Sequence, residues 1–355
     1  MTVAKEAVDR MSAKLEKIRG TGVPIEIGEE FRLLTLEVIG ELVLSLPADE
    51  SNRVFPDLYL PIVTEANKRI WDPTRKFMPT PTQFAYQKTV TGLNDYMCDL
   101  IRKRWAERQA RKTTGSTKKV PDILDQTLAT IDPADWSEAT VLQLRDEFKS
   151  FVLAGHETSA SMLTWCLYEC IENDDVRERL INESVEVFGP GRAEEGDQFT
   201  SVPLPTRDDL NRLGYTVNAL KEALRKYTPV PIVVRMAKEN DVIDGQNIPA
   251  GTRMFVNIKA IHDDPAIWES PDTFNPDRFA EKFDPYAFLP FINGPRNCLG
   301  QHLALLEVSV WVFCSVYRST KAKSGRESSR DRRGDIIRKA EFYLLLRPLR
   351  DLCMR

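Results

Sequence analysis

Apolar residues recur at helical spacing through the first two-thirds of the chain. In the first twenty residues they place Ala4, Val8, Met11, Leu15 and Ile18 on one side of a predicted amphipathic helix. The same spacing predicts five further helices, over residues 31–46, 54–69, 83–111, 136–171 and 207–226. The segments between them include residues 71–81, which hold three prolines and are expected to form a loop, and the basic, Ser/Thr/Gly-rich residues 111–121, a predicted solvated linker.

Short β-branched runs replace the helical pattern after residue 229. They predict strands over residues 231–235, 241–243 and 252–258, and Asp244-Gly245 predicts a two-residue hairpin turn. Coil over 263–295, a helix over 299–317, a charged loop over 319–335 and a last strand over 341–346 complete the pattern. We therefore predict a mainly α protein with a small β-sheet (α+β). It should form one domain, helical over 1–228 and mixed over 229–355.

Composition and charge exclude several classes of protein. The 355 residues carry 49 basic and 53 acidic side chains, a net charge of −4, so no nucleic-acid partner is expected. No run of about 20 apolar residues predicts a membrane-spanning helix. Most of the six cysteines stand far apart, which indicates a reducing compartment and no disulfide framework. Cys166 and Cys170 lie one helical turn apart, and core packing explains them better than a metal site.

The most distinctive segment is Phe291-Ile-Asn-Gly294-Pro-Arg296-Asn-Cys298-Leu-Gly300. A thiolate that binds haem iron needs a tight backbone loop, and the two glycines permit a close approach. Arg296 suits a haem propionate, because a planar guanidinium matches a carboxylate. Cys298 precedes a predicted helix, whose dipole favours the ionised thiol. A lone cysteine before an apolar helix is usually a core residue, but five fixed positions in ten residues favour the ligand.

This segment resembles the haem loop of the cytochrome P450 family at each of its defining positions. The resemblance implies the cytochrome P450 fold, a bound haem b and Cys298 as the ligand of its iron. Phe291, Gly294, Arg296 and Gly300 would then surround the haem on the cysteine side. Three further segments resemble motifs of the same family and occur in the expected order along the chain.

The second motif is Ala154-Gly155-His156-Glu157-Thr158, inside the predicted long helix. A glycine followed by a threonine that can bond back to a carbonyl predicts a local bend. The resemblance implies that Ala154 and Gly155 adjoin the haem and that Glu157 and Thr158 form an acid–alcohol pair that relays protons. A buried helix with one wet glutamate is the plain structural alternative. A zinc-protease motif would need histidine at position 160, which is alanine.

Two motifs together predict a buried ionic cluster. Glu222 and Arg225 are three residues apart on one helix, which taken alone is usually a surface pair. In the family such a pair is buried and binds an arginine of a later segment, here Arg278 of Phe274-Asn-Pro-Asp-Arg-Phe279. We expect these three residues to be structural, holding the loop that leads to Cys298.

Three other residues have weaker predicted roles. Arg235, at the end of a predicted strand, resembles a second propionate ligand. His262 is equally compatible with a contact at the haem edge and with simple packing. His302, on the helix after Cys298, is expected to be exposed.

The family's first strands and the helix that covers the haem have no recognisable counterpart, so the chain resembles an N-terminally incomplete, microsomal-type member. An unpaired sheet edge and an uncovered haem face are therefore expected.

The resemblance implies a haem-thiolate monooxygenase that inserts one atom of O2 into a lipophilic substrate. Electrons would come from NADPH through NADPH-cytochrome P450 reductase or another donor, at the cytosolic face of the endoplasmic reticulum membrane. The alternatives are a haem-free or inactive fragment and an O2-independent isomerase. Thr158 and the uninterrupted loop argue against the isomerase.

Overall fold

The computed structural model describes residues 1–18, 21, 25–114, 121–188 and 204–324. The chain divides into two compact units, one of residues 1–31 and 158 onward and one of residues 32–157. Helices α2 (Ile27–Leu44) and α7 (Glu138–Glu172) contribute residues to both units. The protein is mainly α with small antiparallel sheets, which confirms the predicted fold class. The assignment of the whole chain to one domain stays a prediction.

The described part of the unit of residues 32–157 contains helices and no strand. After α2 the chain continues through α3 (Ala48–Val54), the π-helical turn η1 (Phe55–Tyr59) and α4 (Leu60–Trp71). The predicted loop at 71–81 holds one 3-10 turn, η2 (Pro73–Lys76). Then follow α5 (Pro81–Thr114), α6 (Ile123–Thr130), the 3-10 turn η3 (Pro133–Asp135) and the first part of α7.

A buried ionic cluster joins α5 to α6 in this unit. Arg104 of α5 pairs with Asp122 and with Asp125, whose carboxylate lies 2.7 Å from the guanidinium. Asp122 also accepts a hydrogen bond from the Asp125 amide at 2.6 Å, so it caps the first turn of α6. Ser137 caps α7, because its hydroxyl accepts a hydrogen bond from the Thr140 amide at 3.3 Å.

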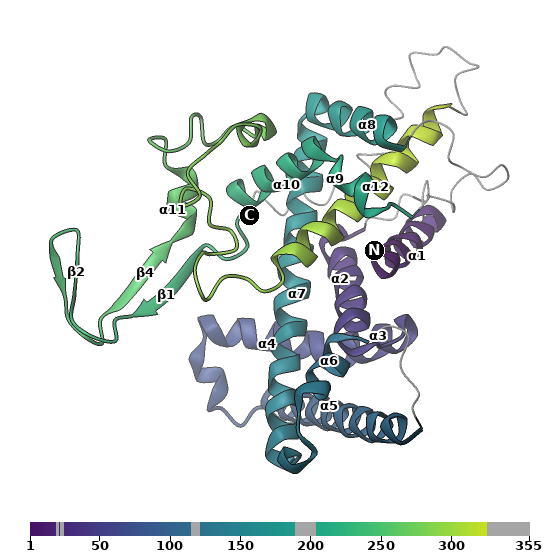
Figure 1. Cartoon of the computed structure of the whole chain (residues 1–355), viewed down its shortest axis with the longest axis vertical. Coiled ribbons are helices and arrows are strands. Elements are labelled where there is room, and N and C mark those ends of the chain that lie inside the picture. The colour runs from purple at the N-terminus through teal and green to yellow at the C-terminus, as the bar shows by residue number, and fades with distance from the viewer. Residues whose placement is uncertain (19–20, 22–24, 115–120, 189–203, 325–355) are drawn as a thin grey trace. The chain divides into compact units, whose positions relative to one another are not determined.

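The other unit contains the remaining helices and both sheets. Its helices are α1 (Thr2–Ile18), α8 (Asp174–Phe188), α9 (Arg207–Asn211), α10 (Gly214–Lys226), α11 (Ile258–Asp263) and α12 (Gln301–Ser324), with a 3-10 turn, η4 (Pro276–Phe279). Helix α12 packs against α1, α8 and α10 (Figure 1). The predicted apolar side of α1 is buried at Ala4, Val8 and Met11.

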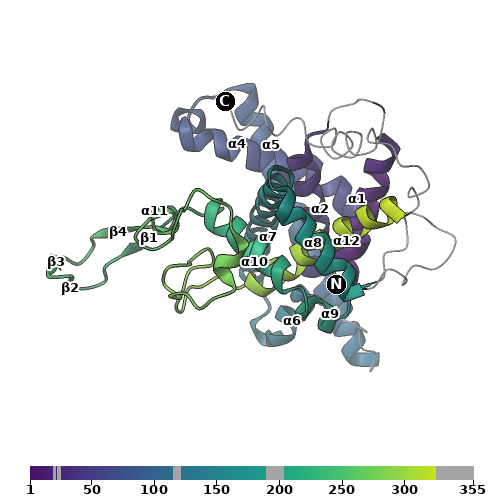
Figure 2. The same ribbon diagram turned by 90° about the horizontal axis from the view of Figure 1, so that it is seen from above.

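The strands form an arm of two antiparallel pairs. Strands β1 (Ile232–Met236) and β4 (Arg253–Asn257) pair with Val234 opposite Phe255. Strands β2 (Asp241–Ile243) and β3 (Gln246–Ile248) form the predicted hairpin at the far end of the arm, as Figures 1 and 2 show. Asp244 and Gly245 both have positive φ, as this turn requires.

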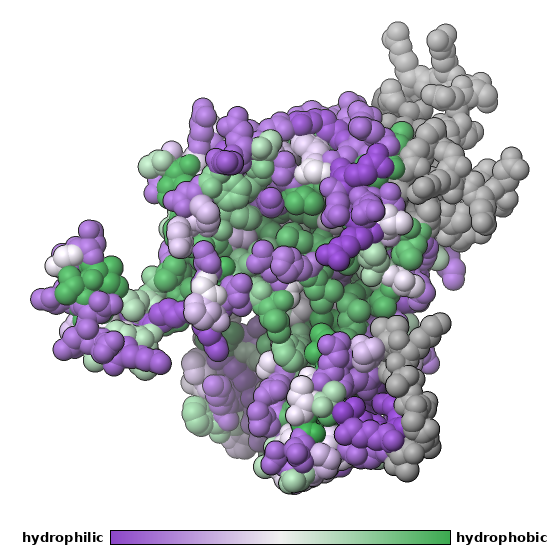
Figure 3. Space-filling model, in the orientation of Figure 1, coloured by the Kyte–Doolittle hydropathy of each residue, from purple (hydrophilic) through white to green (hydrophobic). Residues whose placement is uncertain are grey.

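Both sheets are two-stranded within the described residues, so the long edges of β1 and β4 are unpaired there. Ile232, Val234, Met236 and Phe255 are exposed on one face of the arm. In Figure 3 apolar surface accordingly appears on the arm among polar side chains. The expected open sheet edge stays a prediction for the whole chain.

The predicted helix over 207–226 is wrong as a single element. It divides into α9 and α10, and the chain turns at Leu213 before Gly214. The cause is Glu183 of α8, whose carboxylate accepts hydrogen bonds from the Tyr215 and Thr216 amides at 2.6 and 2.8 Å. Those amides are free only at the start of a helix, so Glu183 caps α10.

Helices α3, α6, α8 and α11 were not predicted, and α12 begins two residues later than expected. Most of the predicted linker at 111–121 and charged loop at 319–335, and the whole last strand at 341–346, lie outside the described residues. No helix of the described part of the chain is both long and apolar enough to cross a membrane.

Candidate functional site

The loop before α12 presents the Cys298 thiol to solvent. The Cys298 amide donates to the Phe291 carbonyl at 2.8 Å, and the Asn297 amide donates to the Gly294 carbonyl at 3.1 Å. Cys298 is exposed, unlike Cys98, Cys166 and Cys170, which are buried free thiols. The loop is therefore folded back on itself with its sulfur pointing outward.

Gly294 and Gly300 stand on either side of Cys298, and of these two only Gly294 has a backbone conformation that favours glycine. Gly294 has φ +89°, a backbone conformation that residues with a Cβ rarely adopt. There is space for a Cβ at this position, since nothing lies within 4 Å of where it would stand. A Cβ on Gly300 would lie 3.9 Å from the Cys298 sulfur. The Ala304 amide donates to the Gly300 carbonyl at 2.9 Å, so the helix begins just after the loop and its N-terminus lies near the thiol.

The exposed groups of this loop fit a flat apolar cofactor that carries carboxylates. Leu299, next to the thiol, is 84% exposed, which is unusual for a leucine at the start of a buried helix. Arg296 is exposed in the same loop and could bind a carboxylate. An exposed thiol, an apolar side chain and a guanidinium within four residues are the groups that a haem would cover.

Arg235 lies apart from the loop, on β1. Its side chain is exposed, and its guanidinium donates to the Val234 carbonyl at 3.0 Å. Its predicted role as a propionate ligand is compatible with this exposure and stays a prediction.

Glu222 and Arg225 form a fully buried ion pair on α10. The Arg225 guanidinium donates to both Glu222 carboxylate oxygens, at 2.8 and 2.9 Å, and both side chains are 0% exposed. Arg278 of η4 donates to Glu222 at 3.0 Å, and so does the Asn275 amide. The predicted cluster of Glu222, Arg225 and Arg278 is therefore present in the structure.

The two arginines of the cluster also bind backbone carbonyls of the coil that leads to Cys298. Arg225 donates to the carbonyls of His262 and Pro271 at 2.8 and 2.7 Å. Arg278 donates to the carbonyls of Glu269, Ser270 and Thr273 at 2.9–3.3 Å. Carbonyls that have no strand or helix to pair with are thus satisfied by the guanidinium groups.

His262 is completely buried and packs in this same unit. Its Nε2 accepts a hydrogen bond from the Leu289 amide at 3.0 Å, and its ring stacks on Phe288. Burial lowers the pKa of His262 to about 4, so the ring is neutral and can accept this bond at neutral pH. These contacts favour packing, one of the two roles left open by the sequence. His302 is exposed, as predicted.

The motif on α7 places Ala154, Gly155, Glu157 and Thr158 within about one turn of one helix. Ala154 is exposed, and its neighbour Leu153 is an exposed apolar residue. A Cβ on Gly155 would stand 2.6 Å from Cδ1 of Ile39 on α2. Close packing of two helices is thus a reason for this glycine that the predicted bend did not include.

His156 and Glu157 lie in a cluster of ionisable side chains. The buried His156 ring has Nδ1 3.0 Å from the Val152 carbonyl and Nε2 3.4 Å from the Glu157 carboxylate. Arg32 lies 3.4 Å from the other Glu157 oxygen. The interaction with His156 is the largest cause of a lowered pKa at Glu157; burial opposes it, and the Arg32 charge adds to it.

Arg32 and Tyr59 were missed by the sequence analysis. Tyr59 stands edge-on to the His156 ring with 5.2 Å between centroids, and burial raises its pKa, so its hydroxyl stays neutral. Both residues lie about a hundred positions or more before His156 in the sequence. No local pattern marks either one, because their partner is set by helix packing.

Cys166 and Cys170 are buried, as predicted for core residues. Hydrogen bonding to Cys170 and burial raise the pKa of Cys166 well above its usual value. Within the described residues, no cluster of three or more His, Cys, Asp or Glu side chains could hold a metal ion.

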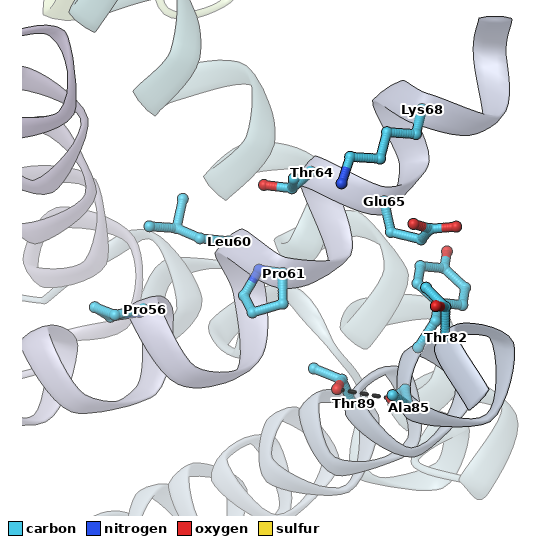
Figure 4. Close-up of a pocket in the computed structure, with 10 residues that line it drawn as sticks. Pro56, Leu60, Pro61, Thr64, Glu65, Lys68, Thr82, Ala85 and Thr89 are labelled. Atoms are coloured by element: carbon cyan, nitrogen blue, oxygen red, sulfur yellow. Dashed lines mark hydrogen bonds between the residues drawn. The ribbon is translucent and has the colours of Figure 1, made fainter.

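An open pocket of about 400 Å³ lies between α4 and α5 (Figure 4). Pro56, Leu60 and Pro61 line one part of it, and Glu65 and Lys68 another. Hydrogen bonding to Arg75 is the main cause that lowers the pKa of Glu65 to about 2. None of the predicted site residues lines this pocket, so it gives no information about the predicted haem site.

Comparison with known proteins agrees with the geometry. The sequence model described as Cytochrome P450 matches residues 1–318. The chain is 30% identical over 331 residues to Cytochrome P450 4c21 of Blattella germanica, which covers 87% of this chain and 63% of that protein. It is 30% identical over 326 residues to human Cytochrome P450 4X1, covering 87% and 62%.

A plant protein, LUTEIN DEFICIENT 5, chloroplastic, of Arabidopsis thaliana, is 30% identical over 334 residues, which cover 88% of this chain and 53% of that protein. The chain thus spans less than two-thirds of the length of these curated relatives. The family match itself extends over most of the chain and includes the loop with the exposed thiol. The chain belongs to the cytochrome P450 family.

Proposed function

We propose that the protein is a haem-thiolate monooxygenase. It would insert one oxygen atom of O2 into a lipophilic substrate and reduce the other to water. The two electrons would come from NADPH, through NADPH-cytochrome P450 reductase or another donor. The observation that carries the proposal is the exposed Cys298 thiol in a folded loop between Gly294 and Gly300.

Haem b is the cofactor in this proposal, and when bound it supplies the redox centre that activates dioxygen. Cys298 would bind its iron, and Arg296 and Arg235 would pair with its propionates. Phe291, Gly294 and Gly300 would adjoin it from the loop, and Ala154 and Gly155 from α7. The exposed Leu153 and Leu299 support an apolar neighbour for both segments.

Glu157 and Thr158 would move protons to the oxygen site. Glu157 can exchange a proton with water, because its side chain is 30% exposed. Thr158, the next residue, carries a hydroxyl that can donate and accept. An O2-independent isomerase would need neither group.

The spectrum of the reduced, carbon monoxide-treated protein tests the proposal. Purified full chain should show the red-shifted Soret band of thiolate ligation, and Cys298→Ala should abolish it. Cys98→Ala, which removes a buried thiol of the other unit, should keep the band. A wild-type spectrum of histidine-ligated haem, or no haem absorbance at all, would overturn the assignment and favour a haem-free fragment.

We also propose that the protein acts at the cytosolic face of the endoplasmic reticulum membrane. Support comes from α4, η2 and the start of α5, where Trp71 is 89% and Phe77 84% exposed. Exposed apolar groups are also present at Ile70, Met78 and Phe84, and exposed cations at Lys68, Lys76 and Lys88. Aromatic side chains among cations suit an anionic lipid surface.

Flotation with vesicles of neutral and anionic lipid tests this second proposal. The full chain should float with anionic vesicles, and a Trp71→Ser, Phe77→Ser double variant should float less. Wild-type protein that stays with the soluble fraction would overturn it.

A further inference from the structure

The ring of His156 has a fixed donor on one side. Nδ1 lies 3.0 Å from the Val152 carbonyl, one turn earlier on α7. A carbonyl oxygen only accepts hydrogen bonds, so Nδ1 must carry a hydrogen to make this contact. In a neutral ring with this tautomer, Nε2 has no hydrogen and is itself an acceptor.

The other side of the ring faces an acceptor. Nε2 is buried and makes no hydrogen bond within the described part of the chain, yet it lies 3.4 Å from Oε1 of Glu157. An ionised carboxylate also only accepts. A bare Nε2 and an ionised Glu157 would therefore place two lone pairs against each other in a buried site. One proton between them removes that conflict, on either the ring or the carboxyl group.

The charged groups around the pair decide which atom holds this proton. Arg32 of α2 lies 3.4 Å from Oε2 of Glu157, which favours the carboxylate form. Tyr59 of η1 presents its ring to His156 and stays neutral, so it adds no negative charge. The arrangement therefore favours an imidazolium at His156 beside a carboxylate at Glu157.

The backbone holds the pair in place from a second direction. Thr35 of α2 donates from its hydroxyl to the His156 carbonyl at 3.0 Å, and both groups are buried. Ile39, one turn further along α2, packs where Gly155 leaves room. His156 thus has a fixed backbone and a fixed ring, as a group that exchanges a proton with a neighbour requires.

We infer that His156 and Glu157 share one exchangeable proton, and that His156 is a positioning residue that acts through Glu157 by resupplying it. The proton would move from Nε2 to Oε1, and Glu157 would then pass it to the oxygen site. The pair is then a neutral ring and a carboxylate, and it regains a proton from water at the exposed part of Glu157. The transfer role rests on the proposed function, whereas the shared proton is a property of the resting protein.

Nitrogen NMR of the histidine rings tests the shared proton without turnover. The chain has three histidines, so His156→Gln assigns the His156 signals by their loss. In the reduced, carbon monoxide-treated full chain at neutral pH, both ring nitrogens of His156 should carry hydrogen. In Glu157→Gln the Nε2 resonance should shift to that of an unprotonated nitrogen, because the anionic partner is gone. Exposed Glu186→Gln is the matched control and should leave the signals unchanged.

The measurement is decisive whether or not the chain binds haem, since either form is then diamagnetic. An unprotonated Nε2 in the wild-type chain, or the same Nε2 signal in wild type and Glu157→Gln, would overturn the inference. A protonated Nε2 in a chain without the thiolate Soret band would keep the shared proton and remove only the monooxygenase role.

Turnover gives a second readout. His156→Gln keeps a polar side chain of similar reach but cannot store a proton. It should lower product per NADPH severalfold and raise hydrogen peroxide, increasingly so as pH rises, with KM unchanged. Product per NADPH equal to wild type across the pH range would overturn the resupply role.

Discussion

Replacing Arg225 with methionine should destabilise the unit that carries Cys298 by about 3–5 kcal/mol, the cost of removing one partner of a buried ion pair. Methionine retains much of the volume but none of the donors. The guanidinium makes two hydrogen bonds to Glu222 and two to the carbonyls of His262 and Pro271. Glu222 keeps Arg278 and the Asn275 amide, which places the loss toward the lower end of that range.

The chain offers a matched control for burial. Arg179 also makes two hydrogen bonds to one carboxylate, that of Asp277, at 2.6 and 2.7 Å. Both of these side chains are about half exposed, and such surface pairs contribute about 0–1 kcal/mol. Arg179→Met should therefore cost far less than Arg225→Met, which removes a buried two-bond pair and two further bonds to carbonyls.

Hydrogen exchange followed by mass spectrometry is the suitable assay, because it reports opening free energies segment by segment in a chain of two units. Peptides that cover α10 and residues 269–279 should lose protection in Arg225→Met. Adding Glu222→Gln to that variant should restore part of it, since no uncompensated carboxylate then remains. Equal losses for Arg225→Met and Arg179→Met would refute the claim that burial makes the difference.

Two further predictions concern other buried contacts. Gly155→Ala should destabilise its unit by up to about 2 kcal/mol, since overpacking costs about 1–3 kcal/mol and alanine stabilises the helix by about 1 kcal/mol relative to glycine. In urea unfolding, adding Ile39→Val should restore part of the lost stability. A Gly155→Ala variant as stable as wild type would contradict the close contact with Ile39. Burial raises the pKa of Glu307 from 4.5 to about 8, so stability should fall as pH rises through that window, because the folded chain holds a proton that the unfolded chain releases. Glu307→Gln should flatten this dependence and exposed Glu186→Gln should not; identical pH profiles would exclude a buried carboxyl.

The parts of the site that the sequence predicted are those where chemistry is local. The hairpin at Asp244-Gly245 was predicted because two adjacent residues decide the turn, and both have the positive φ it needs. The exposed thiol lies in a ten-residue segment that folds into one loop, with backbone hydrogen bonds from Cys298 to Phe291 and from Asn297 to Gly294. Residue types and spacing are sufficient in such cases, since the partners are sequence neighbours.

The failures arise where a distant residue decides a local outcome. The break between α9 and α10 depends on Glu183, some thirty residues earlier, whose carboxylate caps α10. The space at Gly155 is filled by Ile39, more than a hundred residues away. Helical spacing favoured one continuous helix in the first case, and a glycine followed by a threonine favoured a bend in the second. Neither the cap nor the close contact produces a periodic pattern of residues that the sequence analysis could detect.

The coil before Cys298 has almost no regular structure, yet the thiol needs a fixed position to act as a ligand. Ion pairs and a neutral histidine supply what strands and helices do not. Arg225 and Arg278 bind five carbonyls between His262 and Thr273, and the His262 ring accepts the Leu289 amide. The bonds of the two arginines are made by side chains that cost free energy to bury unless they are fully paired. The loop is therefore held by interactions that are strong only when complete, so the loss of one partner should affect the whole segment up to Cys298.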